Sequence, residues 1–163
     1  MLLDAGYTDL QDEPRFQEHS LDELREEFRA GALRFDSWDA YLEAARARPR
    51  FWRPALEARA RAGMREEDGA VVQLVDPDTG AAALYGVAVE PPSEVLARIR
   101  CSVLLVVATE TVEQLGERPL ERFRTALPQA EVVTLDSGHD LLADAFDETV
   151  DAVGAFVTRA AHA

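Results

Sequence analysis

One histidine, His139, stands in a sequence context that could support catalysis. It follows an apolar segment and lies in the stretch Asp136-Ser-Gly-His139-Asp140, directly after Gly138. A histidine side chain titrates near neutral pH, so it can take a proton from a nucleophile and return it to a leaving group. Gly138 lets the backbone of such a loop approach its neighbours closely. We therefore predict a general base at His139; the alternative is a surface or capping histidine beside Asp140.

The segments around His139 alternate between strand and helix. Residues 102–108 form a continuous Val-rich apolar run, and residues 131–135 form a second short apolar segment. Such runs are typical of parallel strands that helices cover on both faces. The amphipathic segment 117–127 between them predicts a helix. Residues 1–4 resemble the end of another buried strand, so the order predicts an α/β fold with about three parallel strands.

The last predicted helix covers residues 144–160. Four apolar residues recur along it at helical spacing, namely Phe146, Val150, Val153 and Val157. This periodicity puts the four residues on one side of the helix.

The middle of the chain, residues 20–92, predicts mainly short helices. Ser20 and Glu23 form a capping-box pattern ahead of the first of them. An Asp-Pro-Asp-Thr-Gly stretch at 76–80 predicts a turn, because proline fixes φ and glycine tolerates positive φ. We expect helices at 21–29, from Ser37 onward, at 52–62 and at 81–89. We expect a short strand at 70–75.

Much of the chain resembles the C-terminal half of the α/β-hydrolases. The resemblance rests on SVLLVVATET followed by PLERFRTALPQAEVVTLDSGHDLLAD, and on Leu2-Leu-Asp-Ala-Gly-Tyr7 near the start. It implies a partial α/β-hydrolase fold, with residues 1–19 and 93–163 in the core and residues 20–92 as a helical cap or lid. It also implies that His139 is the catalytic histidine.

The resemblance leaves two candidates for the acid that orients His139. The family's usual position follows the strand at 103–108, where this sequence has Thr-Glu110-Thr in place of the expected Asp. Some members, haloalkane dehalogenases among them, use a carboxylate after an earlier strand, which corresponds to Asp4. Such an acid holds the imidazole tautomer and stabilises the imidazolium. Glu110 and Asp4 both stay open, as does the reading that neither serves.

The nucleophile of the resembled family has no counterpart in this sequence. The family carries it in G-x-S-x-G, and none of Ser20, Ser37, Ser93, Ser102 and Ser137 stands in that motif. In the family the nucleophile motif precedes the acid and the histidine in the chain, so its expected place here is upstream of Met1. We therefore expect a truncated hydrolase that is inactive alone, because a base without a nucleophile and oxyanion donors loses most transition-state stabilisation.

Composition restricts the partners. The formal net charge of −14 disfavours nucleic-acid binding, and no apolar run reaches the roughly 18 residues of a membrane helix. A single cysteine, Cys101, fits a reducing, cytoplasmic setting, and we predict that it packs at the start of an apolar strand. The sequence contains no C-x-x-C, H-E-x-x-H or Walker pattern, so we expect neither a metal nor a cofactor.

Two functions therefore stay open. The first is hydrolysis of a small, apolar ester or amide substrate by the complete enzyme. The second is a degenerate, non-catalytic remnant that acts as an interaction or ligand-binding module. In either case the first strand would be an exposed sheet edge, which invites pairing with an N-terminal-half chain or with a second copy.

Overall fold

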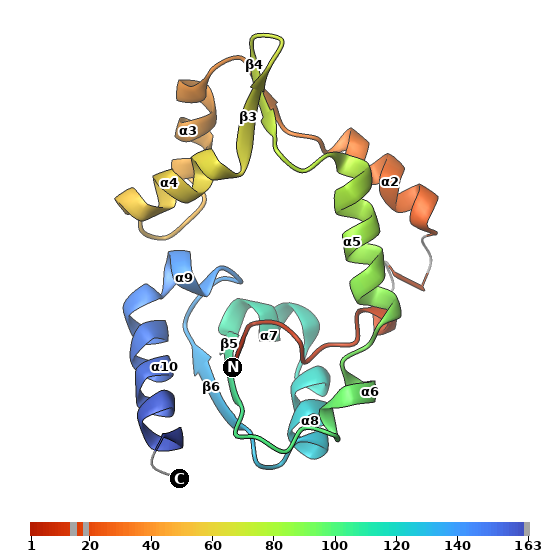
Figure 1. Ribbon diagram of the computed structural model, residues 1–163, viewed down its shortest axis with the longest axis vertical. Helices are drawn as coiled ribbons and strands as arrows, with labels where there is room; N and C mark the ends of the chain where they lie inside the picture. Colours follow the sequence, from red (N-terminus) through yellow and green to blue (C-terminus); the bar gives the residue numbers. More distant parts are fainter. Residues whose placement is uncertain (14–15, 18–19, 162–163) are drawn as a thin grey trace. The chain divides into compact units, whose positions relative to one another are not determined.

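The computed structural model describes residues 1–13, 16–17 and 20–161. The chain divides into two compact units (Figure 1). Unit 1 comprises Met1–Asp9 and Pro91–Ala163, and unit 2 comprises Leu10–Glu90.

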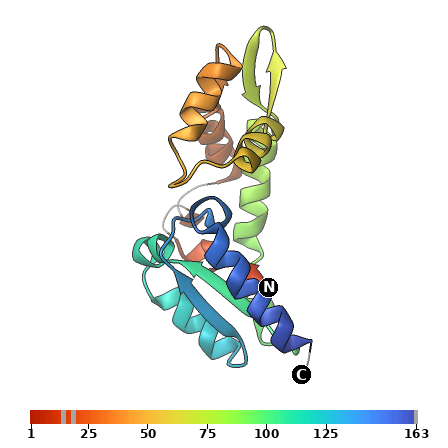
Figure 2. The same ribbon diagram turned by 90° about the vertical axis from the view of Figure 1, so that its left-hand side faces the viewer.

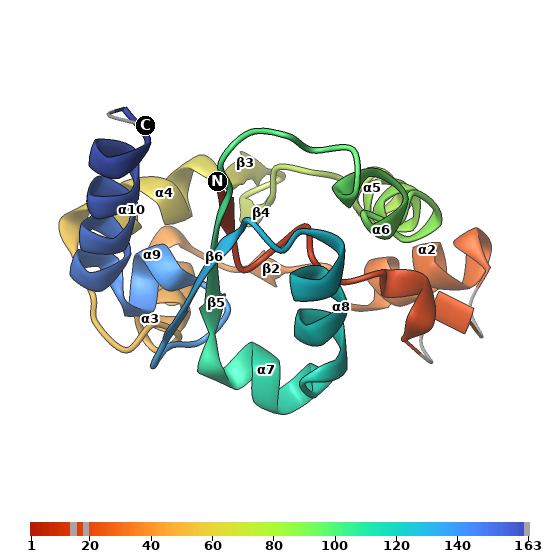
Figure 3. The same cartoon turned by 90° about the horizontal axis from the view of Figure 1, so that it is seen from below.

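Unit 1 is built on a parallel sheet with the strand order β1-β5-β6, which confirms the predicted α/β class. The strands are β1 (Leu2–Leu3), β5 (Leu104–Ala108) and β6 (Glu131–Leu135). All five residues of β5 are buried, because this central strand is covered on both faces. Figure 3 shows the sheet between α10 (Phe146–Ala160) on one side and α8 (Arg118–Ala126) on the other.

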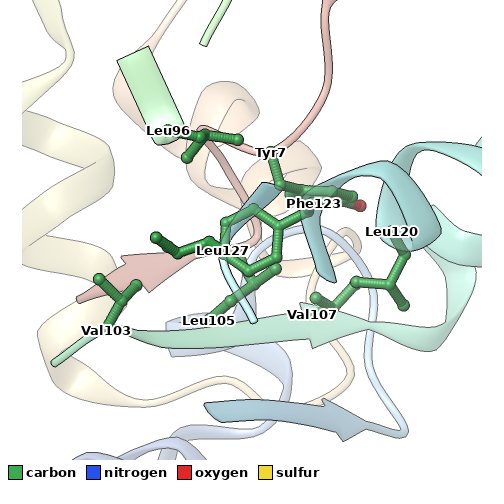
Figure 4. Packing of buried hydrophobic residues seen from close by; sticks show 8 residues of the cluster. All are labelled: Tyr7, Leu96, Val103, Leu105, Val107, Leu120, Phe123 and Leu127. Carbon is green, nitrogen blue, oxygen red and sulfur yellow. The ribbon is translucent and has the colours of Figure 1, made fainter. Parts of the chain in front are cut away.

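Alternate side chains of β5 enter two separate hydrophobic clusters. Leu105 and Val107 pack with Leu120 and Phe123 of α8, as Figure 4 shows. Leu104 and Val106 pack on the opposite face with Leu141 of α9 (Leu141–Asp144) and with α10. The alternation follows from the two-residue period of a strand. The remaining helices of unit 1 are α6 (Ser93–Leu96) and α7 (Thr109–Leu115).

The apolar side expected for the closing helix is only partly buried. Its sheet-facing side carries Ala152, Val153 and Phe156, whereas Phe146, Val150 and Val157 are 38%, 48% and 56% exposed. The predicted single helix is also divided at Ala145, whose φ of −141° and ψ of 53° are not helical. The periodicity identified a broad apolar side of this helix, but only the edge that carries Val153 packs against the sheet.

Unit 2 combines short helices with a three-stranded antiparallel sheet of order β2-β4-β3. Its strands are β2 (Arg34–Phe35), β3 (Met64–Glu67) and β4 (Ala70–Gln73), of which β2 and β3 were not predicted. Figure 2 shows β3 and β4 as a two-stranded ribbon. The turn between them holds Asp68 and Gly69 at positive φ, which suits a tight hairpin. The 3-10 helix η1 covers Leu10–Asp12, and the α-helices are α2 (Leu21–Ala30), α3 (Trp38–Arg46), α4 (Pro54–Ala62) and α5 (Pro77–Val89).

Two local predictions in this unit have opposite outcomes. The capping box is confirmed, since the Ser20 hydroxyl accepts from the Glu23 amide and the Glu23 carboxylate accepts from the Ser20 amide. The turn predicted at 76–80 is wrong, because α5 already begins at Pro77. The Asp76 side chain caps this helix and Pro77 occupies its first turn, where a missing N–H costs nothing.

The prediction for Cys101 is also wrong, since its side chain is exposed. The strand β5 begins three residues later, at Leu104, and burial begins at Val103. No helix in the described part of the chain is long and apolar enough to cross a membrane.

Phe123 anchors the α8 side of unit 1, because its side chain is fully buried against β5. We expect Phe123→Ala to lower the free energy of unfolding by about 3–5 kcal/mol, through lost burial and a residual cavity. Urea unfolding measures this change. Arg124→Ala, on the exposed side of the same helix, is the matched control and should change it by less than about 0.5 kcal/mol. Equal effects of the two substitutions would contradict the described packing.

Tyr7 belongs to the same cluster and is 6% exposed. Burial, and after it the negative charge of Asp4, raises the pKa of the Tyr7 phenol from 10.0 to about 12. The unfolded chain therefore loses this proton at lower pH than the folded chain, so the stability should fall as the pH rises from 10 to 12. Tyr7→Phe should remove the contribution of Tyr7 to this loss of stability between pH 10 and pH 12. Urea unfolding midpoints measured across this pH range test it. A tyrosinate absorbance titration in which all three tyrosines ionise near pH 10 would contradict the prediction.

Candidate functional site

The site begins where β1 ends. Leu2 and Leu3 pair with Leu105 and Val106 of β5, and the amide of Asp4 then donates to the Val106 carbonyl at 2.7 Å. Asp4 itself has a φ of +46°, in the left-handed region that aspartate tolerates better than most residues. The chain leaves the sheet at this residue, and the carboxylate stays at the carboxyl end of the strands.

This carboxylate meets His139. The Oδ2 atom of Asp4 lies 2.8 Å from Nδ1 of His139, a residue 135 positions away in the sequence. The Asp4 side chain is fully buried, whereas the His139 side chain is 76% exposed. An ionised carboxylate can only accept, so Nδ1–H donates and the ring is held in the Nδ1–H form when neutral. The opposite ring edge, with Nε2, is thereby left at the surface.

Two further donors complete the surroundings of Asp4. The amide of Ala108, the last residue of β5, donates to Oδ1 at 3.1 Å. The hydroxyl of Thr111 donates to Oδ2 at 2.6 Å. A buried carboxylate is tolerable only when hydrogen bonds replace its water, and here three donors do so. Sequence reasoning missed Thr111, since nothing in its spacing marks it as a partner of Asp4.

The loop that carries His139 is tied to the start of α7. The Thr109 hydroxyl donates to the Leu135 carbonyl at 2.9 Å and accepts from the Ser137 amide at 3.2 Å. The Glu110 amide donates to the Ser137 carbonyl at 3.2 Å. Residues after β5 therefore hold the chain that leaves β6, and this places His139 over Asp4.

The loop at Gly138 passes close to two side-chain carboxylates. A Cβ atom at this position would lie 2.7 Å from Oδ2 of Asp144 and 3.3 Å from Oε2 of Glu110. The backbone next to His139 thus passes directly beneath two carboxylates. The approach is the one expected from glycine at this position, although the sequence did not indicate which groups come close.

The three predicted site residues can now be placed. Asp4 and His139 form a hydrogen-bonded pair at the carboxyl edge of the sheet. Glu110, in the first turn of α7, is exposed and carries its carboxylate over Gly138. Of the two candidate acids, Asp4, which follows the first strand, is the one in hydrogen-bonding contact with His139. Catalysis by these residues stays a prediction.

The pair has the arrangement of a base and its orienting acid. A carboxylate on Nδ1 fixes the ring and stabilises the positive charge that appears when Nε2 takes a proton. Nε2 is the nitrogen left to exchange that proton with a reacting group. Among the described residues, no group of three or more His, Cys, Asp or Glu side chains is arranged to hold a metal ion.

Unit 2 contains a separate cavity of about 490 Å³. Its lining includes Phe28, Leu33 and Val75, together with Gln73 and the carboxylate-bearing Glu27. Elsewhere in the same unit, the rings of Trp38 and Tyr41 contact each other at a centroid distance of 6.1 Å, and Phe51 is 60% exposed.

Solved structures resemble this chain in fold. No protein-family model matches the sequence, and no curated protein matches it. The crystal structure of E-2-(acetamidomethylene)succinate hydrolase is similar, with a TM-score of 0.67 and 20% sequence identity over 85% of this chain and 52% of that one. A thioesterase domain from the curacin biosynthetic pathway is also similar, with a TM-score of 0.53 and 18% identity over 74% of this chain and 42% of that one.

The chain thus spans about half the length of the solved structures that it resembles. At these identities the similarity establishes the fold. Together with the parallel sheet, the two covering layers of helices and the position of His139, it shows that this chain has a partial α/β-hydrolase fold.

Proposed function

We propose that this chain supplies the acid–base pair of a hydrolase. The observation that carries the proposal is the 2.8 Å contact between Asp4 and His139, with the carboxylate buried and the imidazole at the surface. Both similar structures are named for hydrolytic activities, a hydrolase and a thioesterase, which supports hydrolysis as the class of reaction. The proposed substrate is a small ester, thioester or amide.

In the proposed reaction, Nε2 of His139 takes the proton of an attacking hydroxyl as its oxygen bonds to the carbonyl carbon. The imidazolium then returns this proton to the leaving group as the carbon–heteroatom bond breaks. Asp4 stays ionised and balances the positive charge of the ring. The second half of the reaction repeats these steps with water as the attacking group.

The attacking hydroxyl is not evident within these 163 residues. No serine stands in a G-x-S-x-G sequence, and Ser137, the serine nearest to His139 in the sequence, is fully buried with its hydroxyl donating to the Gly138 carbonyl. The proposal therefore requires a nucleophile and oxyanion donors from a segment other than these residues, joined to them or on a separate chain.

The 163-residue chain alone should not turn over 4-nitrophenyl butyrate above the rate of free imidazole, because His139 has no positioned hydroxyl to activate. Absorbance of released nitrophenolate measures this rate. Robust turnover that His139→Ala abolishes would show that the chain is active alone.

The hydrolase proposal itself is tested by joining the chain to the coding sequence that precedes its first codon. The proposal requires that this added segment carries a G-x-S-x-G nucleophile. Ester turnover by the joined protein should fall at least ~10²-fold in His139→Ala, the effect typical of removing a general base. Turnover that is indifferent to His139, or none in a folded joined protein that carries the G-x-S-x-G motif, would contradict the proposal.

A second candidate function is self-association without catalysis, and the outer surface of unit 1 supports it. The strand β1 forms one edge of the sheet. On α10, Phe146, Val150 and Val157 are exposed. Arg159 of the same helix binds Glu131 of β6. Because Val150 and Arg159 are nine residues apart, they lie on opposite sides of the helix, so this apolar flank faces away from β6.

Under this second proposal a copy of the chain covers the apolar flank. We expect light scattering after size exclusion to give the mass of a dimer, and Val150→Asp to give a monomer by burying a charge at the contact. Ala155→Asp, an exposed position elsewhere on α10, is the control and should leave the dimer intact. A wild-type chain that is monomeric at high concentration would contradict self-association.

A further inference from the structure

The end of β5 and the segment that follows it hold both oxygens of the Asp4 carboxylate. The amide of Ala108, the last residue of β5 and directly before this segment, donates to Oδ1, and three residues later the Thr111 hydroxyl donates to Oδ2. The oxygen bound by Thr111 is also the one that accepts from Nδ1 of His139. We propose that Thr111 is a positioning residue for His139, which acts through the carboxylate of Asp4.

The geometry explains why two attachment points matter. Without Thr111, Asp4 would keep the Ala108 amide on Oδ1, but only the imidazole of His139 would hold Oδ2 against rotation about the Cβ–Cγ bond. Donors on both oxygens fix the plane of the carboxylate. The distances of 3.1 Å to Oδ1 and 2.6 Å to Oδ2 place both donors within hydrogen-bonding range.

The position of Thr111 in the fold suits it to hold the Asp4 carboxylate. It lies in the first turn of α7, which begins directly after β5, so its backbone is fixed by the same strand that pairs with β1. A β-branched side chain in a helix has few rotamers, which restricts the directions in which the Thr111 hydroxyl can point. The resemblance to hydrolases places an acid in this segment; in the structure the segment also supplies a donor to Asp4, the acid that follows β1.

The hydroxyl of Thr109, two residues earlier, binds the histidine loop instead of the carboxylate. Thr109 Oγ1 joins the Leu135 carbonyl to the Ser137 amide and thereby holds the loop of His139. The two threonines of one helical turn thus fix the two partners separately, Thr109 the histidine loop and Thr111 the carboxylate. The inference rests on the proposed function for its catalytic meaning, but the hydrogen-bond chain can be measured without turnover.

The experiment uses the 163-residue chain labelled with ¹⁵N-histidine, in long-range ¹H–¹⁵N spectra at a pH where the imidazole is neutral. In the wild type, His139 should be the Nδ1–H tautomer, with an Nδ1 proton protected from solvent exchange. Thr111→Val should raise the exchange rate of this proton about fivefold or more, the factor that a typical hydrogen bond contributes. Thr111→Ser keeps the hydroxyl and should restore the protection.

Backbone amide spectra show whether each variant is folded, and Thr111→Ala replaces Thr111→Val if the valine is not accommodated. Unchanged exchange in the folded Thr111→Val or Thr111→Ala protein would overturn the positioning role while leaving the proposed function in place. Failure of Thr111→Ser to restore protection would overturn it too, because the methyl group would then be responsible. A wild-type His139 in the Nε2–H form would instead overturn the Asp4–His139 pair and the proposed function with it.

Discussion

The burial of one charged group, the Asp4 carboxylate, constrains the architecture of unit 1. Its side chain is fully buried, and burying an unpaired carboxylate would cost far more than a domain's net stability can offset. The donors that make the burial tolerable come from the end of β5, from the first turn of α7 and from the loop after β6. These segments meet only when the sheet is formed in its observed register.

That register follows from the hydrophobic pattern of the strands. Leu2 and Leu3 pair with Leu105 and Val106, and Ala108 pairs with Leu135 of β6. A shift by one residue would exchange the two faces of β5, which pack in different clusters. The apolar core therefore sets the alignment in which Asp4, Thr111 and His139 come together at the carboxyl edge, where α/β sheets commonly place their ligands.

The surface of unit 1 is consistent with a fold that covers about half of the hydrolase structures it resembles. Its sheet has three strands, and β1, at one edge, is only two residues long. The apolar flank of α10 is left exposed although the opposite flank is bound to β6 by the Arg159–Glu131 pair.

The sequence by itself determined the parts of the fold that depend on local pattern. The apolar run at β5 required a strand covered on both faces, the amphipathic pattern indicated α8, and Ser20 with Glu23 marked the start of α2. The position of His139 after β6 also followed from the order of elements. These features are set by residues that are close in the chain, so their side chains report on them directly.

Only the tertiary structure showed the contact between Asp4 and the imidazole of His139, and only it revealed Thr111. The contacts of Asp4 with Thr111 and His139 join residues 107 and 135 positions apart, and no local pattern encodes such pairs. The same holds for the buried side of α10, where a broad apolar stripe left two flanks equivalent until the sheet selected one. Local periodicity specifies that a face is apolar, whereas the register and direction of packing depend on surfaces that are brought together only by folding.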